Sequence, residues 1–177
     1  MLNKLGNNMK WLTNINEAKE ESLHLRKPIL LQFEMEGCGG CKKLYNKTYP
    51  DASVIKEMTE KFVLLKLDLI KDRVIRKELS AYWTPSFYFL DYKGKSYFNF
   101  NGYLPPEEFR IILRLGYAET LIPKGGYADA IEFMQKDIEQ LGNRNPLMPK
   151  LLSQIGIADY IKTKDKNSFM KLMAHIY

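Results

Sequence analysis

The sequence predicts an α/β fold of three layers, in which helices cover both faces of a central mixed sheet, followed by a helical C-terminal extension. Three apolar runs have the length and composition of buried strands: 29–33, 62–68 and 87–90. Segments with the spacing of helices separate these runs. The third run is followed by a turn, 91–95, and then by a fourth strand, 96–100, which pairs back as a hairpin. This order is typical of layered α/β proteins.

The N-terminal part begins with a helix that leads into the first strand. Asn14 and Glu17, three residues apart, form a capping box and predict a helix over 14–25. Pro28 then stops the helix and precedes the strand 29–33, because proline cannot continue a helix.

The first and second strands are joined by two helical segments with a break between them. A helix is expected over 42–47, and Tyr49-Pro50-Asp51 interrupts it. Asp51 or Ser53 can cap a second segment, 54–61, which leads into the strand 62–68. A strand, a helical crossover and a second strand form a βαβ unit, so these two strands should be parallel.

The second half of the fold ends on a well-marked helix. A short helix over 73–82 precedes the third strand, and the hairpin follows it. Pro105 and Pro106 then open a helix that has Glu107 and Glu108 in its first turn and continues to about Ala118. The resulting order, α-β-α-β-α-β-β-α, predicts a four-stranded sheet.

The chain divides into three parts. Residues 1–10 are expected to be an N-terminal lead, 11–120 the α/β domain and 125–177 a helical extension. The extension is too short and too interrupted to build a core of its own, so it should pack on the domain or on a partner. Its expected helices are 128–141, 148–154, 158–161 and 167–176.

Composition excludes several classes of protein. Of the 177 residues, 45% are hydrophobic, which suffices for a core without a disulfide framework. The net charge is +6, but the cations are interleaved with acids, which favours a solvated surface over a nucleic-acid partner. No apolar run reaches the roughly 20 residues of a membrane helix, and we expect no membrane span. As written, the chain is expected to be cytoplasmic, or extracytoplasmic if a signal segment has been removed.

The sequence Cys38-Gly39-Gly40-Cys41 contains both cysteines of the chain and follows the first strand directly. A helix start stabilises a thiolate, which is the reactive form of cysteine, so this position favours redox chemistry. Two alternatives stay open. The pair could be half of a zinc site, which would need His24 and His175 from opposite ends of the chain, or it could be a purely structural disulfide. We expect neither a metal nor a cofactor.

Three features, in this order and spacing, resemble the thioredoxin superfamily over residues 11–118. They are the Cys38–Cys41 motif after a buried strand, Thr84-Pro85 before a strand, and Gly102 before the last helix of the domain. The stretch 41–68, with its break before Asp51, is similar to the subfamily that includes the C-terminal domain of the thiol:disulfide interchange protein.

The resemblance implies a thiol:disulfide oxidoreductase with a thioredoxin-like fold, in which Cys38 is the attacking thiol and Cys41 the resolving one. It also implies that Pro85 is cis and lies against the cysteine pair. The implied substrate-binding residues are Thr84, Pro85, Gly39 and Gly40. The implied partners are a disulfide-containing protein substrate and a thiol or reductase that donates electrons.

The motif departs from that of thioredoxins at three positions. Gly37 and Gly40 stand where thioredoxins have a tryptophan and a proline, and Gln32 stands where they have a buried aspartate that aids proton transfer. Glu34 points to the same face of the strand as Gln32, because side chains alternate along a strand. Glu34 is therefore a candidate proton shuttle.

Two functional interpretations follow. The first is an enzyme that reduces protein disulfides. The second is a binding or dimerisation module with the same fold, with redox activity secondary, that uses apolar positions of its C-terminal helices: Ile131, Met134, Ile138, Leu151, Leu152, Phe169 and Met173.

Overall fold

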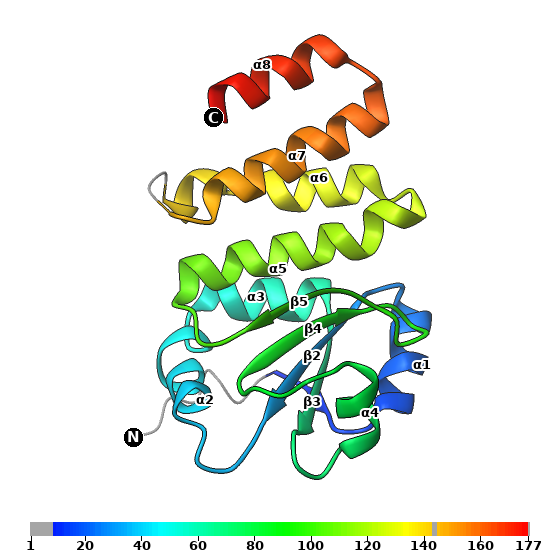
Figure 1. The fold of residues 1–177 in the computed structure, drawn as a ribbon, viewed down its shortest axis with the longest axis vertical. Coiled ribbons are helices and arrows are strands. Elements are labelled where there is room, and N and C mark those ends of the chain that lie inside the picture. Colours follow the sequence, from blue (N-terminus) through cyan, green and yellow to red (C-terminus); the bar gives the residue numbers. More distant parts are fainter. Residues whose placement is uncertain (1–8, 143–144, 177) are drawn as a thin grey trace.

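A computed structural model describes residues 9–142 and 145–176. The sequence predicts an N-terminal lead over residues 1–10, and residues 1–8 of this lead lie outside the described residues. Figure 1 shows a central sheet with helices on both faces and further helices stacked beyond one of them. The predicted fold class, a layered α/β domain with a mixed sheet and C-terminal helices, is confirmed.

The sheet has five strands rather than the expected four. Their order is β1-β3-β2-β4-β5; β2 and β1 run parallel to β3, whereas β4 is antiparallel to β2 and to β5. The additional strand, β1, consists of Trp11 and Leu12, which pair with Leu64 and Leu65. Two residues are too few to show a period, so the sequence pattern missed it. The strands are β1 (Trp11–Leu12), β2 (Ile29–Glu34), β3 (Val63–Asp68), β4 (Ser86–Leu90) and β5 (Ser96–Asn101).

The helices of the domain lie on both faces of this sheet. One hydrophobic cluster joins α1 and α4 to one face, and a second joins α3 and α5 to the other. The helix after the cysteines begins as α2 and continues as one turn of π-helix. The elements are α1 (Ile15–Leu25), α2 (Gly39–Lys43), the π-helix Leu44–Thr48, α3 (Ala52–Lys61), α4 (Arg73–Glu78) and α5 (Pro106–Leu121).

Two helices begin where their capping residues predict. The Asn14 side chain accepts hydrogen bonds from the backbone N–H groups of Asn16 at 2.8 Å and Glu17 at 3.3 Å. The Asp51 side chain does the same for the first turn of α3, with bonds of 2.9 and 3.0 Å. Each cap satisfies amides that have no partner inside the helix.

The C-terminal extension differs from its prediction in two places. The helix predicted over 128–141 is broken after α6, where Asp137 adopts a φ of 50°. The two segments predicted over 148–154 and 158–161 form one helix, α7, that continues through Gly156. The elements are the 3-10 turns Ile122–Lys124 and Ile138–Leu141, and the helices α6 (Tyr127–Gln135), α7 (Met148–Thr163) and α8 (Lys166–Ile176).

Gly156 is inside α7 because α8 packs closely against it. A Cβ atom at this position would lie 2.7 Å from Leu172 Cδ2 and 2.9 Å from Met173 Cε of α8. The glycine therefore permits a close helix contact and does not end the helix, although glycine is a common helix breaker in sequence.

The helix α5 is enclosed on all sides, because it lies between the sheet and the C-terminal helices (Figure 1). Its side chains share one hydrophobic cluster with Phe87 and Phe89 of the sheet and with Phe133 of α6 and Leu151 of α7. The first two helices of the extension thus complete the core above α5. Because its middle turns are buried all round, α5 needs partners on the side away from the sheet as well, and α6 and α7 provide them.

A buried ion cluster links three helices of this stack. Glu57 of α3 forms ion pairs with Arg110 Nη2 at 2.7 Å and with Arg114 Nη1 at 2.7 Å. All three side chains are almost fully buried. Arg114 Nη2 also donates to the carbonyl of Lys136, the residue after α6, at 2.9 Å. The cluster therefore connects α3, α5 and the end of α6.

Candidate functional site

The two cysteines lie at the end of β2, where the chain turns into α2. Cys38 is the N-cap of α2, and its Sγ accepts a hydrogen bond from the backbone N–H of Cys41 at 3.1 Å. The two residues form a disulfide, with their Cα atoms 5.3 Å apart. Cys38 is 7% exposed and Cys41 is 5% exposed. One free amide of the helix start, that of Cys41, thus points at the sulfur of Cys38, where it would stabilise a thiolate.

Pro85 lies directly against the cysteine ring. The antiparallel pairing of Phe33 with Ser86 brings the start of β4 next to the end of β2. A Cβ atom built on Gly40 would lie only 2.6 Å from Pro85 Cδ. The Thr84–Pro85 peptide bond is cis. Gly40 therefore has no room for a side chain, whereas a Cβ atom on the neighbouring Gly39 would meet nothing within 4 Å.

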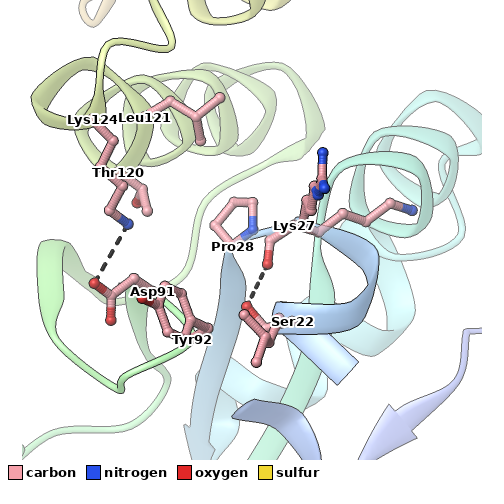
Figure 2. A pocket seen from close by; sticks show the side chains of 10 residues that line it. Ser22, Lys27, Pro28, Asp91, Tyr92, Thr120, Leu121 and Lys124 are labelled. Carbon is pink, nitrogen blue, oxygen red and sulfur yellow. Dashed lines mark hydrogen bonds and ion pairs between the residues drawn. The ribbon is translucent and has the colours of Figure 1, made fainter. Parts of the chain in front are cut away.

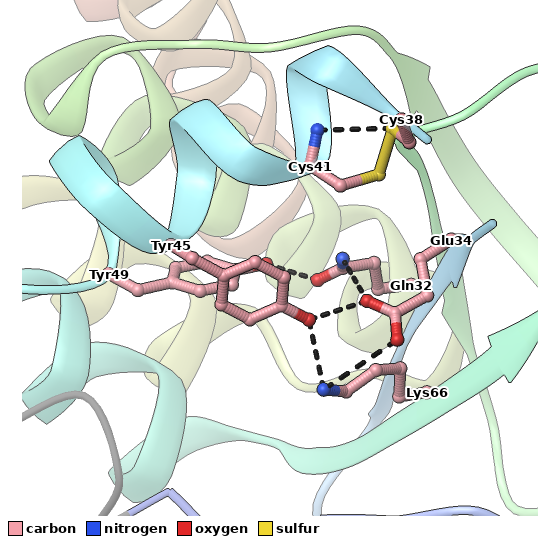
Figure 3. Close-up of a disulfide and its surroundings, with 7 residues drawn as sticks. All are labelled: Gln32, Glu34, Cys38, Cys41, Tyr45, Tyr49 and Lys66. Atoms are coloured by element: carbon pink, nitrogen blue, oxygen red, sulfur yellow. Dashed lines mark hydrogen bonds and ion pairs between the residues drawn. A yellow bond between two sulfur atoms is a disulfide. The ribbon is translucent and has the colours of Figure 1, made fainter. Parts of the chain in front are cut away.

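A polar cluster lies under the cysteine pair (Figure 3). Glu34 Oε2 accepts from the Tyr45 hydroxyl at 2.5 Å, and Glu34 Oε1 lies 3.9 Å from Lys66 Nζ. Lys66 Nζ also donates to the Tyr45 oxygen at 2.9 Å. Gln32 Nε2 donates to Glu34 Oε2 at 3.5 Å, and Gln32 Oε1 accepts a short hydrogen bond from the Tyr49 hydroxyl. The carboxylate is thus held by groups from β2, β3 and the π-helix.

Both tyrosines of this cluster stay protonated at physiological pH. Burial, followed by the hydrogen bond and the charge of Glu34, raises the pKa of Tyr45 far above its usual value. Burial likewise raises the pKa of Tyr49. Because each phenol keeps its proton, each acts as a donor: Tyr45 donates to Glu34, which also faces Lys66 and Gln32, and Tyr49 donates to Gln32.

Several exposed apolar side chains come from loops at the same end of the sheet as the disulfide. Met35 follows β2, Ile70 follows β3, and Tyr82 and Trp83 precede Pro85, so all four come from loops at the edge where β2 and β3 end and β4 begins. Tyr82 is 75% exposed and Trp83 is 57% exposed. Large apolar groups left in water next to a reactive pair are typical of a surface that contacts another molecule.

The structure brings most of the predicted site residues together, but it separates Glu34 from the sulfurs. Cys38, Cys41, Gly40 and Pro85 form one contact region, with Thr84 half-buried beside it. Among the described residues, no hydrogen bond joins Glu34 to either cysteine. Its partners are the side chains described above.

Sequence reasoning missed Tyr45 and Lys66. Tyr45 lies four residues after Cys41, the spacing of neighbours on one helix face, and that spacing is visible in the sequence. Lys66 interrupts the apolar run of β3, and its pairing with Gln32 of β2 brings it beside Glu34. A charged residue within a buried strand is a signal for a polar partner.

A mixed sheet, a disulfide at a strand-to-helix junction and a proline packed on that disulfide define a dithiol protein of thioredoxin-like architecture. The family model described as a thioredoxin-like domain matches residues 15–116. The chain belongs to the thioredoxin-like family. The fold and the Cys38–Cys41 pair together support the class of thiol–disulfide oxidoreductases.

Curated relatives agree with this assignment. The chain is 26% identical over 102 residues to the thiol:disulfide interchange protein DsbD of two Campylobacter jejuni strains. The match covers 55% of this chain and 18% of the relative, so the chain spans less than a fifth of the length of these proteins. The expected resemblance to the thiol:disulfide interchange subfamily is confirmed.

Solved structures show the same fold. A thioredoxin from Thermus thermophilus superposes with a TM-score of 0.55 at 20% identity, over 60% of this chain and 85% of the other. The reduced C-terminal domain of DsbD from Neisseria meningitidis superposes with a TM-score of 0.51 at 18% identity, over 58% and 93% of the two chains. Across the part of this chain that the structure describes, no helix is both long enough and apolar enough to cross a bilayer.

The contact between Gly40 and Pro85 leads to a prediction about two adjacent glycines. Alanine favours a helix over glycine by about 1 kcal/mol, so Gly39→Ala should leave the oxidised protein as stable as wild type or more stable. Gly40→Ala should lose about 1–3 kcal/mol, because its methyl group would overlap Pro85. Urea unfolding of both variants measures the difference. Equal stability of the two would contradict the close contact.

Proposed function

We propose that the protein is a thiol:disulfide oxidoreductase that reduces disulfides in other proteins. The observation that carries this proposal is the Cys38–Cys41 pair, with Cys38 capping a helix and Pro85 packed against the ring. Membership of the thioredoxin-like family supports it. The names of the DsbD relatives, which describe thiol:disulfide interchange, support it further.

The reaction uses the two sulfurs in sequence. The Cys38 thiolate attacks one sulfur of a substrate disulfide, forms a mixed disulfide and displaces the other substrate sulfur as a thiolate, which takes up a proton. Cys41 then loses its proton and attacks Cys38 Sγ. The Cys38–Cys41 disulfide forms and the second substrate thiol is released. A donor, either a reductase with its own dithiol or two molecules of a small thiol, becomes oxidised to a disulfide and returns two electrons and two protons to the pair.

The surroundings of the disulfide suit a polypeptide substrate. Met35 precedes the cysteine motif, Tyr82 and Trp83 precede Pro85, and their exposed side chains offer apolar contact at this end of the sheet. The backbone of Thr84 stands at the free end of β4, where an extended segment could add as a strand. Gly39 presents no side chain to hinder approach to the sulfurs. These residues form the proposed substrate surface.

The residues between the two cysteines favour reduction of the substrate over its oxidation. Two glycines between the cysteines give the reduced form more conformational freedom, and that entropy favours the dithiol. Cys38 receives one backbone N–H bond from the helix start. We therefore expect a thiolate that is stabilised only moderately, as in a reductase rather than a strong oxidant.

Glu34 is the proposed acceptor of the Cys41 proton. It lies on the strand that leads to the motif, and Tyr45, its hydrogen-bond donor, is one helical turn beyond Cys41. The carboxylate would reach the thiol directly or through a water molecule, while Tyr45 and Lys66 hold it in place. Tyr45 and Lys66 are positioning residues in this scheme.

Replacing the attacking thiol should abolish the activity. Cys38→Ser is expected to reduce insulin no faster than dithiothreitol alone, because the attacking thiolate is lost and the remaining Cys41 is the resolving thiol in this scheme. Cys41→Ser should instead accumulate a mixed disulfide with substrate, visible on a non-reducing gel. If Cys38→Ser and wild type reduce insulin at the same rate, the enzyme interpretation is wrong.

Removing the Glu34 carboxylate should slow the resolving step. In Glu34→Gln the mixed disulfide should persist about 10-fold longer or more at pH 7, and the deficit should shrink as the pH rises toward the thiol pKa, because Cys41 then loses its proton to solvent. Stopped-flow measurement across a range of pH gives both the lifetime of the mixed disulfide and its dependence on pH. Glu36→Gln removes an exposed carboxylate from the same loop and serves as the control. Identical pH profiles for the two variants would exclude the shuttle.

A second candidate function is a binding or dimerisation module that uses the C-terminal helices. Three large apolar side chains of α7 and α8 remain substantially exposed: Ile157, Tyr160 and Met170. Self-association through this face would cover them. Sedimentation velocity should then show a dimer that Met170→Lys dissociates, whereas Val74→Lys, at an even more exposed apolar position on α4, should not. A monomer at all concentrations would reject the dimer.

A further inference from the structure

A cavity of about 260 Å³ lies at the end of the sheet opposite the disulfide. The end of α1, Pro28 before β2, the turn after β4 and the end of α5 enclose it (Figure 2). The strands β2 and β4 run from this cavity to the cysteine site, so the two features lie at opposite ends of the same strands. The proposed redox chemistry makes no use of the cavity.

The walls of the cavity are mainly apolar. Leu23 of α1, Pro28, Tyr92 of the turn and Leu121 of α5 line it from different elements. Leu23 is 60% exposed and Tyr92 is 40% exposed, although such side chains gain free energy on leaving water. The volume is close to the lower end of the roughly 300–1,000 Å³ of small-molecule sites.

The one carboxylate that lines the cavity is already satisfied. Asp91 accepts backbone N–H bonds from Lys93 at 2.9 Å and Lys95 at 3.0 Å, a hydroxyl bond from Tyr97 at 3.2 Å, and an ion pair with Lys124 at 3.4 Å. Burial opposes its ionisation, but these amides and Lys124 outweigh burial and lower its pKa. Asp91 is therefore ionised and fully bonded, and it does not need a cation from a ligand.

Two cations that line the cavity, Lys27 and Arg26, have fewer partners than Asp91. Lys27 Nζ donates to the carbonyl of Thr59 at 3.2 Å, and Figure 2 shows the Lys27 side chain leading away from the cavity. Among residues 9–142 and 145–176, no side chain forms an ion pair or hydrogen bond with the Arg26 guanidinium. Arg26 is the C-cap of α1 and adopts a φ of 54°, a conformation that glycine adopts readily.

We propose that this cavity binds a small organic carboxylate with an aliphatic or aromatic body. The carboxylate would pair with Arg26 and with Lys124, which is 40% exposed on the opposite wall. The apolar body would lie against Leu23, Tyr92 and Leu121. A cationic ligand would meet Arg26 and Lys124 without a free carboxylate to balance it, and a neutral ligand would form no ion pair with either cation.

The test is a titration of the ¹⁵N-labelled, oxidised protein followed by NMR. Sodium 4-phenylbutyrate should give saturable shifts confined to the amides of residues 22–28, 91–95 and 120–126. The neutral 4-phenylbutanol should bind at least about 5-fold more weakly, the value of one charge-assisted contact near a surface. The amine 4-phenylbutylamine should not saturate the same amides.

Two variants decide whether Arg26 is responsible. Arg26→Gly removes the guanidinium and suits the positive φ, so the fold should be kept. Its affinity for 4-phenylbutyrate should fall at least about 5-fold. Lys164→Gly is the matched control, because Lys164 has a φ of 62° at the end of α7 and also loses one positive charge. It should bind like wild type.

A third variant supports the same conclusion from the opposite wall. Lys124→Gln should weaken 4-phenylbutyrate binding about 3-fold or more, a smaller loss because Asp91 shares this cation. Equal binding of the acid and the alcohol, or equal affinity of Arg26→Gly and Lys164→Gly, would overturn the proposal. So would shifts centred on residues 37–41. None of these outcomes depends on whether the protein reduces disulfides.

Discussion

Two arginines of α5 share a single buried carboxylate, Glu57 of α3, and the arrangement of the layers beyond the sheet depends on this contact. Ions removed from water are costly unless several hydrogen bonds replace their hydration. Arg114 replaces most of its hydration with both oxygens of Glu57 and with the carbonyls of Arg110 and Lys136, although its buried Nε has no hydrogen-bond partner among the described residues. Because these partners lie on α3, on α5 and at the end of α6, the cluster ties the end of α6 to the two helices beneath it.

At the end of the sheet that carries the cysteines, the packing depends on a glycine, Gly40, which has no side chain. Gly40 lets Pro85 approach the ring of the disulfide, and the pairing of β2 with β4 holds both in place. The same two strands carry the apolar cavity at their other ends. The rigid centre of the sheet therefore separates two chemically different surfaces. One has the disulfide and exposed aromatic side chains, and the other has an arginine that forms no ion pair or hydrogen bond with a side chain in the described part of the chain.

Local signals in the sequence predicted most of the scaffold. Asn14, Pro28 and Asp51 mark element boundaries through their own backbone chemistry, and the apolar runs mark the strands. Long-range pairing produced the features that were missed. Trp11 and Leu12 form a strand only because β3 lies beside them. Gly156 stays helical because α8 packs on it. Lys66 meets Glu34 through sheet register, which a single sequence does not reveal.

The stacking of the C-terminal helices gives the molecule a gradient of local stability. The helix α8 has no buried residue and packs on α7, whereas α5 is buried throughout its middle turns. Segments with few buried contacts open at lower free energy than the rest of a structure, and their amide hydrogens exchange sooner. Opening of α8 leaves α6 and α7 over α5. The far end of the chain can therefore unfold and refold repeatedly while the disulfide and its sheet stay intact.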